Sequence, residues 1–307
     1  MSARRTDSGL DGILAVDKPA GWTSHDVVAR ARGILKQRRA GHTGTLDPMA
    51  TGLLVLCLGR ATRLVEYMVG HDKRYVGRIA LGVTTATDDA EGEVLTRRPV
   101  PTITPELLEP VLERFRGDIL QRLPAFSAVK IAGQRSYHLA RQGKPTEIPP
   151  RPVTIRAFTV TGVNQAALDI DVTCSAGTYI RSLARDIGEE LGCGAHLSAL
   201  RRLRVGPLRV EHAVTLDQLQ QLATAGRLED FLLPADEGVS SLDAAILSSD
   251  GLRVFTNGGV CTAQSGTSRG AARARIYGVS GEFAGVASVS SFGEIKPLKV
   301  FGRRKSA

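Results

Sequence analysis

Alternating and continuous apolar runs mark the predicted strands of this chain. In 168–174 every second residue is apolar, and Asp169, Asp171 and Thr173 stand between them. This period of two is typical of a strand with one buried face. Leu53–Leu58 is apolar throughout, as expected of a strand buried on both faces. Similar patterns predict further strands at Gly12–Val16, Tyr75–Val83, Arg273–Val279, Phe283–Val289 and Leu298–Phe301.

Other segments repeat their apolar residues at helical spacing. The first follows a capping residue, Thr23 or Ser24, and runs to Leu35. The second begins at 104–106 with proline in the first helical position, which proline favours. Pro110 lies inside this second pattern, so it is expected either to kink the helix or to delay its start.

A third helix is predicted directly after the strand at 168–174. Its apolar residues run from Ile180 to Leu191, and Gly192 follows where a C-terminal cap belongs. Arg181 therefore falls in the first turn of this helix. A helix dipole slightly disfavours a cation there, so the position suits a functional role better than a structural one.

The order of these elements predicts a mixed α+β domain followed by a smaller all-β domain. Composition changes near Asp236, after which glycine and serine become more frequent and short strand-like runs are separated by turns. We therefore divide the chain into 1–236 and 237–307. Within the first domain, 124–153 is polar and basic without a clear period, and a segment of that length usually carries a function.

The charge of the chain favours a polyanionic partner. Lysine and arginine number 40 against 31 aspartate and glutamate, and the formal net charge is +9. Such an excess promotes binding to nucleic acid through counterion release, although a merely soluble basic surface explains the charge equally well. The cysteines are scattered, as expected of reduced thiols. The polar segment Met1–Gly9 has no signal-peptide pattern, and no apolar run is long enough to cross a membrane, so a cytoplasmic location is expected.

The segment Gly41–Gly52 is the most unusual stretch of the chain. Its three glycines permit tight turns and the close approach of a ligand. Pro48 disfavours a helical conformation at Asp47, so the carboxylate is expected to project from an extended loop. The residues alone leave two interpretations open, a catalytic loop and an ordinary glycine-rich turn with aspartate as a turn residue.

Other known chemistry finds little support in the sequence. The chain lacks a P-loop, a dinucleotide-binding glycine motif after a strand, an H-E-x-x-H pair and a G-x-S-x-G turn. No nucleotide cofactor or metal is therefore expected. Asp88, Asp89 and Glu91 offer carboxylates for a pair with Asp47 as in a glycosidase, but an acidic turn is the simpler interpretation.

Taken together, the motifs resemble those of the bacterial tRNA pseudouridine-55 synthase family, the TruB type. The resemblance extends over nearly the whole chain. The family's insertion motif begins with Pro124–Lys130 and continues with Tyr137, Ala140, Arg141 and Gly143. In chain order, the matching segments are Gly12–Gly21, Gly41–Gly52, Asp72–Tyr75, Pro124–Lys130, Gly177–Arg181, Gly192–Leu197 and Leu200–Arg202.

The resemblance implies an isomerase that converts uridine to pseudouridine in the T-loop of tRNA, with no cofactor. It implies that Asp47 is the catalytic carboxylate and that Arg181, held by Asp89, is its counter-charge. It also implies that Tyr75 lines the uracil pocket. The target base must leave its stack before it can react. The remaining residues expected to bind the substrate are His42, Tyr179, Leu200, Arg201, Arg202 and Lys130.

The roles expected for these binding residues differ. His42 is expected to fill the space that the extruded base leaves, and Tyr179 to form a second wall of the pocket. Leu200 is expected to present a backbone group to the base, while Arg201 and Arg202 hold phosphates.

The resemblance also implies a fold: a mainly antiparallel sheet with helices, a thumb-like insertion at about 124–153, and a PUA-like C-terminal domain. One departure is visible, since Ala86 stands where the family commonly has aspartate. The C-terminal part matches less strongly, chiefly through Asn257-Gly258 and 293–297.

The expected partner is the T-arm of tRNA, bound by a monomer without guide RNA, an obligate protein partner or a membrane. Two alternatives remain. A guide-RNA-dependent pseudouridine synthase is disfavoured by the thumb-like insertion. An RNA-binding chaperone that helps tRNA to fold is compatible with the charge, and one protein can perform both tasks.

Overall fold

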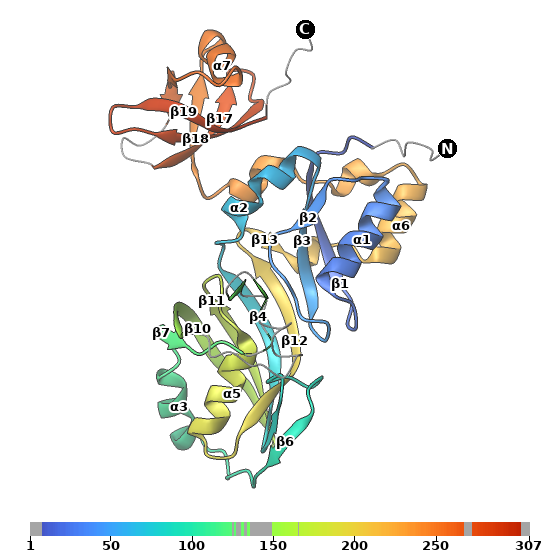
Figure 1. Cartoon of the computed structure of the whole chain (residues 1–307), viewed down its shortest axis with the longest axis vertical. Helices are drawn as coiled ribbons and strands as arrows, with labels where there is room; N and C mark the ends of the chain where they lie inside the picture. The colour runs from blue at the N-terminus through green and yellow to red at the C-terminus, as the bar shows by residue number, and fades with distance from the viewer. Residues whose placement is uncertain are drawn as a thin grey trace.

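The computed structural model describes residues 8–124, 126, 130–131, 134–135, 149–164, 166–266 and 272–301. Most of the predicted insertion at 124–153, including Tyr137, Ala140, Arg141 and Gly143, lies outside these residues. Figure 1 shows two lobes that share one long sheet, and a separate C-terminal sheet. The predicted mixed α and β fold is confirmed.

The large sheet runs through both lobes in the order β1-β3-β12-β4-β11-β10-β7, with β2 and β13 paired at its side. Neighbouring strands are antiparallel except β3 and β12, which pair in parallel only at Thr51 with Arg201 and Gly52 with Arg202. The two lobes therefore join at this short contact. The strands are β1 (Gly12–Lys18), β2 (Ala40–His42), β3 (Thr51–Leu58), β4 (Lys73–Leu81), β7 (Gly117–Gln121), β10 (Arg151–Asn164), β11 (Ala167–Cys174), β12 (Ala195–Val205) and β13 (Leu208–Arg209).

Each lobe has its own helices and core. In the N-terminal lobe, α1 (Ser24–Leu35) packs against α6 (Leu216–Thr224) beside β1 (Figure 1). In the other lobe, α5 (Ile180–Glu190) and α3 (Pro105–Glu113) cover the sheet formed by β4, β10 and β11. Short elements connect these parts: η1 (Gly59–Leu64), α2 (Val65–Met68), β5 (Val83–Thr85), β6 (Val94–Arg97), β8 (Lys130–Ile131), β9 (Gln134–Arg135), η2 (Val210–His212), η3 (Leu228–Phe231) and η4 (Ala235–Val239).

The predicted helices form, with their caps. Thr23 caps α1, and a reciprocal bond with Asp26 completes a capping box. Helix α3 begins at Pro105 and continues through Pro110, so the start is not delayed. Gly192 follows α5 with a φ of +75°, a conformation that glycine adopts without strain.

The long strands β10 and β12 were not predicted. Strand β12 carries Leu200, Arg201 and Arg202, and its polar residues obscure the alternation of a strand. It is an interior strand of the sheet, because β4 and β3 pair with its two edges. The structure thus places a motif that looked like a basic segment at the centre of the sheet.

The C-terminal sheet has the order β15-β19-β18-β17-β14-β16. The C-terminal part of the chain also contains a helix, α7 (Ser249–Thr256), although the sequence predicted only strands there. Leu64 and Val239 pack with Val286 and Phe301 between the two sheets. Of the helices in the described ranges, none has both the length and the apolar character that a membrane span requires. The strands are β14 (Asp243–Leu247), β15 (Cys261–Thr262), β16 (Ser265–Gly266), β17 (Arg273–Gly278), β18 (Phe283–Val289) and β19 (Glu294–Val300).

Candidate active site

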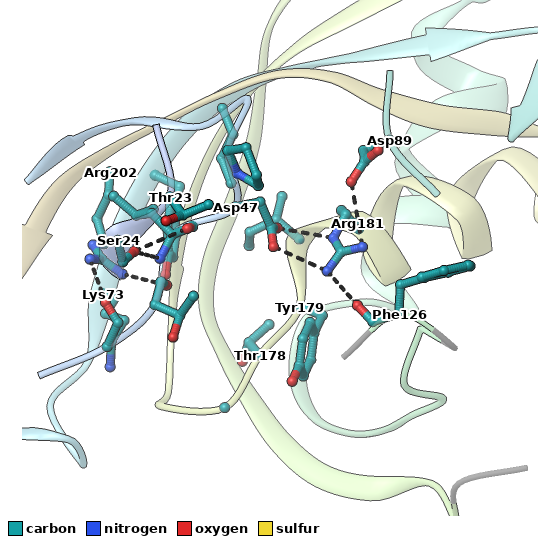
Figure 2. A pocket seen from close by; sticks show the side chains of 18 of the residues that line it. Thr23, Ser24, Asp47, Lys73, Asp89, Phe126, Thr178, Tyr179, Arg181 and Arg202 are labelled. Atoms are coloured by element: carbon teal, nitrogen blue, oxygen red, sulfur yellow. Dashed lines mark hydrogen bonds and ion pairs between the residues drawn. The ribbon is translucent and has the colours of Figure 1, made fainter. Parts of the chain in front are cut away.

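A cleft of about 660 Å³ opens where the two lobes join. Its walls come from the start of α1, the loop between β2 and β3, strands β4 and β12, and the segment that enters α5. Figure 2 shows Asp47 and Arg181 facing each other in this cleft, with Tyr179 and Phe126 beside them. The cleft therefore collects side chains from segments that are far apart in the sequence.

Buried side chains hold the loop that carries Asp47. The Ser24 hydroxyl accepts a hydrogen bond from the Leu46 N–H at 2.8 Å and donates to the Leu46 carbonyl at 3.1 Å. The fully buried Lys18 ammonium donates to the Pro48 carbonyl at 3.0 Å. Both neighbours of Asp47 are thus fixed, so its carboxylate has a defined position.

Arg202 supports the same loop from beneath. Its guanidinium donates to the carbonyls of Gly44 at 3.0 Å, Thr45 at 3.3 Å and Leu53 at 2.7 Å, and the residue is 1% exposed. Gly52 permits this packing, because a Cβ there would lie 2.3 Å from the Arg202 carbonyl oxygen and its φ is +95°. In this arrangement the donors of Arg202 are used inside the protein, and its expected contact with a phosphate stays a prediction.

Asp47 and Arg181 form an ion pair with two contacts. The distance from Arg181 Nε to Asp47 Oδ2 is 3.0 Å, and Arg181 Nη2 donates to Oδ1 at 3.2 Å. The Arg181 side chain is 5% exposed, whereas that of Asp47 keeps 32% of its surface open to the cleft. The carboxylate is therefore oriented by the guanidinium and still accessible to a ligand.

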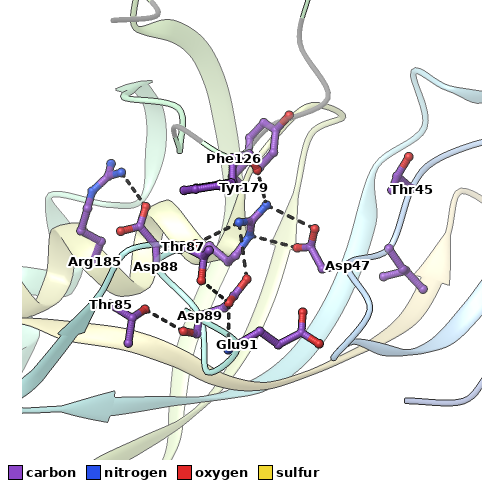
Figure 3. Close-up of polar contacts among 12 residues, drawn as sticks. Thr45, Asp47, Thr85, Thr87, Asp88, Asp89, Glu91, Phe126, Tyr179 and Arg185 are labelled. Carbon is purple, nitrogen blue, oxygen red and sulfur yellow. Dashed lines mark hydrogen bonds and ion pairs between the residues drawn. The ribbon is translucent and has the colours of Figure 1, made fainter. Parts of the chain in front are cut away.

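A second carboxylate holds the far side of Arg181. Asp89 Oδ2 lies 3.4 Å from Arg181 Nη1, and the same nitrogen donates to the Thr87 carbonyl at 2.9 Å. Arg181 Nη2 also donates to the Phe126 carbonyl at 3.0 Å. Figure 3 shows this array, in which Asp89 is itself bonded to the Thr87 hydroxyl. The Arg181 fork is thus fixed from several directions.

The acidic turn after β5 contains Ala86, at the position where the family that the motifs resemble commonly has aspartate. Asp88 in this turn pairs with Arg185 at 2.9 Å, one helical turn beyond Arg181 (Figure 3). Because Asp89 and the Thr87 carbonyl already hold Arg181, the described contacts of this arginine require no carboxylate at position 86.

Burial and charge act in opposite directions on Asp47. Burial raises the pKa of Asp47 above its ordinary value, while the adjacent Arg181 guanidinium lowers it. Burial also lowers the pKa of Lys18 to about 8, with the nearby Asp47 carboxylate opposing that change. An ionised Asp47 therefore depends on the cations that surround it.

Tyr75 and Leu200 form an apolar wall of the cleft. Tyr75 on β4 is 7% exposed and lies beside Arg202 in the strand register, while Leu200 on β12 is 8% exposed and lies opposite Gly77. Burial raises the pKa of Tyr75, so its hydroxyl stays neutral at physiological pH. A neutral aromatic ring of this kind can support a planar base.

The backbone of Tyr179 is clamped by one side chain. The buried Gln121 amide accepts from the Tyr179 N–H at 2.8 Å and donates to the Tyr179 carbonyl at 3.0 Å. Tyr179 is the N-cap residue of α5 and makes no side-chain cap bond. Its ring therefore remains available as a wall of the cleft, beside Thr178 (Figure 2).

His42 lies at the rim formed by β2. Its ring contacts that of His25 edge-on, with 6.1 Å between the centroids. Among the described residues, no hydrogen-bond partner reaches the buried His42 Nδ1. Burial lowers the pKa of His42, so a neutral ring is favoured near pH 7.

Most of the predicted site residues line this one cleft: His42, Asp47, Tyr75, Asp89, Tyr179, Arg181, Leu200 and Arg202. Arg201 does not line it, because its guanidinium pairs with Asp17 at 2.9 and 2.7 Å. Lys130 belongs to β8, but its side chain is outside the described part. The sequence reasoning missed Lys18, Ser24 and Gln121 as supports of the site. Lys18 lies in the matching segment Gly12–Gly21, and Ser24 was considered only as a helix cap.

The arrangement suits nucleophilic or electrostatic catalysis by a carboxylate. Asp47 is accessible and paired with a fixed cation, and an apolar wall lies beside it. Such a carboxylate can attack a sugar carbon or stabilise positive charge that develops there. Within the described ranges, no group of three or more His, Cys, Asp or Glu residues comes together as metal ligands would.

Comparison of the sequence with known proteins gives a consistent result. Residues 32–180 match the family model of the TruB family pseudouridylate synthase N-terminal domain, and residues 181–240 match that of the tRNA pseudouridylate synthase B C-terminal domain. The tRNA pseudouridine synthase B of Streptomyces coelicolor is 52% identical over 229 residues, covering 72% of this chain and 76% of that protein. The protein of the same name from Xanthomonas campestris is 40% identical and covers 100% of this chain and 99% of its own.

Solved structures extend the comparison to the fold. A structure of an H/ACA RNP bound to a substrate RNA containing 2′-deoxyuridine has a chain that is 26% identical, with a TM-score of 0.74 over 97% of this chain and 87% of that one. A Cbf5-Nop10-Gar1 complex contains a chain that is 27% identical, with a TM-score of 0.71, over 95% of this chain and 84% of that one.

Proposed function

This chain belongs to the TruB family of pseudouridylate synthases, and from that membership we propose that it converts uridine to pseudouridine in the T-loop of tRNA, at position 55. The observation that carries the proposal is the array of Asp47, Arg181 and Asp89 in the cleft. An ordinary glycine-rich turn does not require its aspartate to pair with a buried arginine.

The reaction exchanges one bond to the sugar for another. The bond between C1′ and N1 breaks, the uracil turns, and a bond forms between C1′ and C5. The proton on C5 leaves and N1 takes up a proton, so the product is an isomer of the substrate. No electrons are gained or lost overall. Asp47 acts on the sugar as nucleophile or as stabiliser of positive charge, and either role requires the ionised carboxylate that Arg181 favours.

The walls of the cleft would receive the flipped nucleotide. Tyr75 and Leu200 offer an apolar surface next to Asp47, so we assign the uracil to this side. Tyr179 forms another wall of the cleft. His42, at the rim, is assigned to the space that the base vacates, which its neutral ring can fill by stacking.

Other parts of the chain would extend the RNA contact. We assign 1–236 as the catalytic domain, 124–153 as a thumb-like insertion that grips the T-loop, and 237–307 as a PUA-like RNA-binding domain. Lys130 and Arg201 are assigned to contacts with the RNA backbone; Arg201 is the weaker assignment because Asp17 already pairs with it.

We further propose that the protein works alone, as a monomer in the cytoplasm. The names of the bacterial relatives refer to tRNA, which supports a tRNA substrate. One solved relative comes from an H/ACA RNP and another from a Cbf5-Nop10-Gar1 complex, so dependence on partner proteins and guide RNA is the alternative to be tested.

The test uses the purified full chain and a T-arm hairpin transcript without any other protein or RNA. The transcript carries tritium at C5 of uridine, and release of tritium reports bond formation at that carbon. We expect release from the hairpin with uridine at the target position and none when cytidine replaces it. Lack of release from both this hairpin and whole tRNA would contradict the proposed function.

A further inference from the structure

Arg151 occupies a special place at the root of the insertion. It begins β10, where the chain returns to the sheet, and lines the same cleft as Asp47. Its Nη2 donates to the Gly177 carbonyl, and its guanidinium lies over the Tyr179 ring, 5.3 Å from the centroid. Arg151 is thus positioned beside Tyr179 by two independent contacts.

The Gly177 turn is shaped to accept this guanidinium. A Cβ at Gly177 would lie 3.0 Å from Arg151 Nη2, and the φ of +86° favours glycine. Gln121 on β7 is the register partner of Arg151 on β10. The Gln121 side-chain amide bonds to both the N–H and the carbonyl of Tyr179. The pair at the root of the insertion therefore holds both the ring and the backbone of Tyr179.

Among the described residues, Arg151 makes fewer hydrogen bonds than the other cations that line the cleft, with the Gly177 carbonyl as its one acceptor. Arg181 is paired with Asp47 and Asp89, and Arg202 donates to backbone carbonyls. Lys73 likewise donates to the carbonyls of residues 69 and 71. Within the described residues, Arg151 has no carboxylate partner, and its buried Nε has no acceptor.

We propose that Arg151 binds a backbone phosphate of the RNA next to the nucleotide that enters the cleft. The proposal rests on the proposed function, which supplies RNA as the ligand. A guanidinium that lacks an anionic partner gains most from a phosphate, which it recognises through a fork of N–H donors. The contact of Arg151 with Tyr179 places that phosphate at the wall of the cleft that Tyr179 forms.

The first test measures binding of the T-arm hairpin to the full chain as a function of salt. Arg151→Gln should weaken binding by about tenfold and reduce the salt dependence by about one phosphate contact. Arg151→Lys should keep most of the salt dependence, because the positive charge remains. Arg156→Gln is the matched control, since Arg156 lies on the same strand but is exposed and paired with Asp72 outside the cleft.

The second test identifies the phosphate. Each loop phosphate in turn is replaced by an uncharged 2′-deoxy methylphosphonate, with an ordinary 2′-deoxy linkage as control. One replacement should weaken binding to the wild-type protein and to Arg156→Gln, yet have no further effect on Arg151→Gln. Such a loss of additivity shows that the two groups contact each other.

The proposal is overturned if Arg151→Gln keeps the wild-type salt dependence and stays sensitive to every methylphosphonate. A fall in turnover without a change in salt dependence also overturns it, since Arg151 would then only position Tyr179. Both outcomes leave the proposed function intact. Failure of the wild-type protein to modify the hairpin or whole tRNA would instead remove the proposed function.

Discussion

Arg181 contacts both oxygens of the Asp47 carboxylate, through Nε at 3.0 Å and Nη2 at 3.2 Å. The two residues come from opposite lobes, one from the loop before β3 and the other from the first turn of α5. The two residues meet where the lobes are joined by the pairing of β3 with β12. The geometry of the pair therefore depends on how the lobes are joined.

The first prediction concerns Asp47→Asn. The amide has nearly the same shape but is neither a nucleophile nor an anion, so pseudouridine formation should fall below detection. Tritium release at saturating hairpin measures this loss. Binding of tRNA should stay within about threefold of wild type, because Arg181 keeps its contact with Asp89. Turnover at the wild-type rate would contradict the assigned role of Asp47.

A second prediction separates the shape of Arg181 from its charge. Arg181→Lys keeps a positive charge but cannot contact Asp47, Asp89 and two carbonyls at once. The single-turnover rate should fall by about a hundredfold or more, by analogy with the loss of an oriented electrostatic contact. Arg185→Lys, one turn further along α5, is the matched control and should change the rate little. Equal effects of the two substitutions would argue against a special role of the fork.

The third prediction concerns pH. Because burial raises the pKa of Asp47, the carboxylate should become protonated at a higher pH than an ordinary aspartate. The single-turnover rate should therefore decline as the pH falls, with a midpoint above the ordinary value for aspartate. A rate that stays constant down to about pH 4, the ordinary aspartate range, would show that Asp47 titrates normally.

The raised pKa of Asp47 also affects the stability of the fold. The rate should increase with pH, whereas the contribution of Asp47 to stability should decrease with pH. The folded protein holds a proton on Asp47 at a pH where the unfolded chain has lost it, so ionisation of Asp47 disfavours folding as the pH rises through this window. Asp47→Asn should thus gain stability relative to wild type at neutral pH, and the gain should shrink below the ordinary pKa of aspartate. Urea unfolding of both proteins at several pH values measures the difference.

Sequence patterns predicted the elements whose burial follows from the chain itself. Helix α1 with its cap, the buried strand β3 and the alternating strand β11 all formed where expected. Strand β12 was missed, because buried Arg202 and partly buried Arg201 interrupt its apolar pattern. Their burial depends on carbonyls and a carboxylate that other segments supply, which a local pattern does not contain.

The supporting residues of the site were hidden for the same reason. Lys18 and Gln121 are polar and fully or nearly fully buried, yet their partners are 30 and 58 residues away in the chain. Motif resemblance brought Asp47 and Arg181 together in the sequence analysis, but only the structure shows what holds each of them. The roles of the site residues themselves remain predictions.

The last prediction tests the support beneath the loop. Arg202→Met leaves the carbonyls of residues 44, 45 and 53 without their donor in a buried place. The free energy of unfolding should fall by about 3 kcal/mol, as expected when buried groups lose bonds to a charged partner. The neighbouring Arg201→Met is the matched control. It removes a partly exposed pair with Asp17, so its cost should be about 1 kcal/mol or less. Urea unfolding measures both values, and equal losses would contradict the distinct roles of these adjacent arginines. If Arg202→Met instead lowers the salt dependence of RNA binding and leaves stability unchanged, the result would support phosphate binding by Arg202.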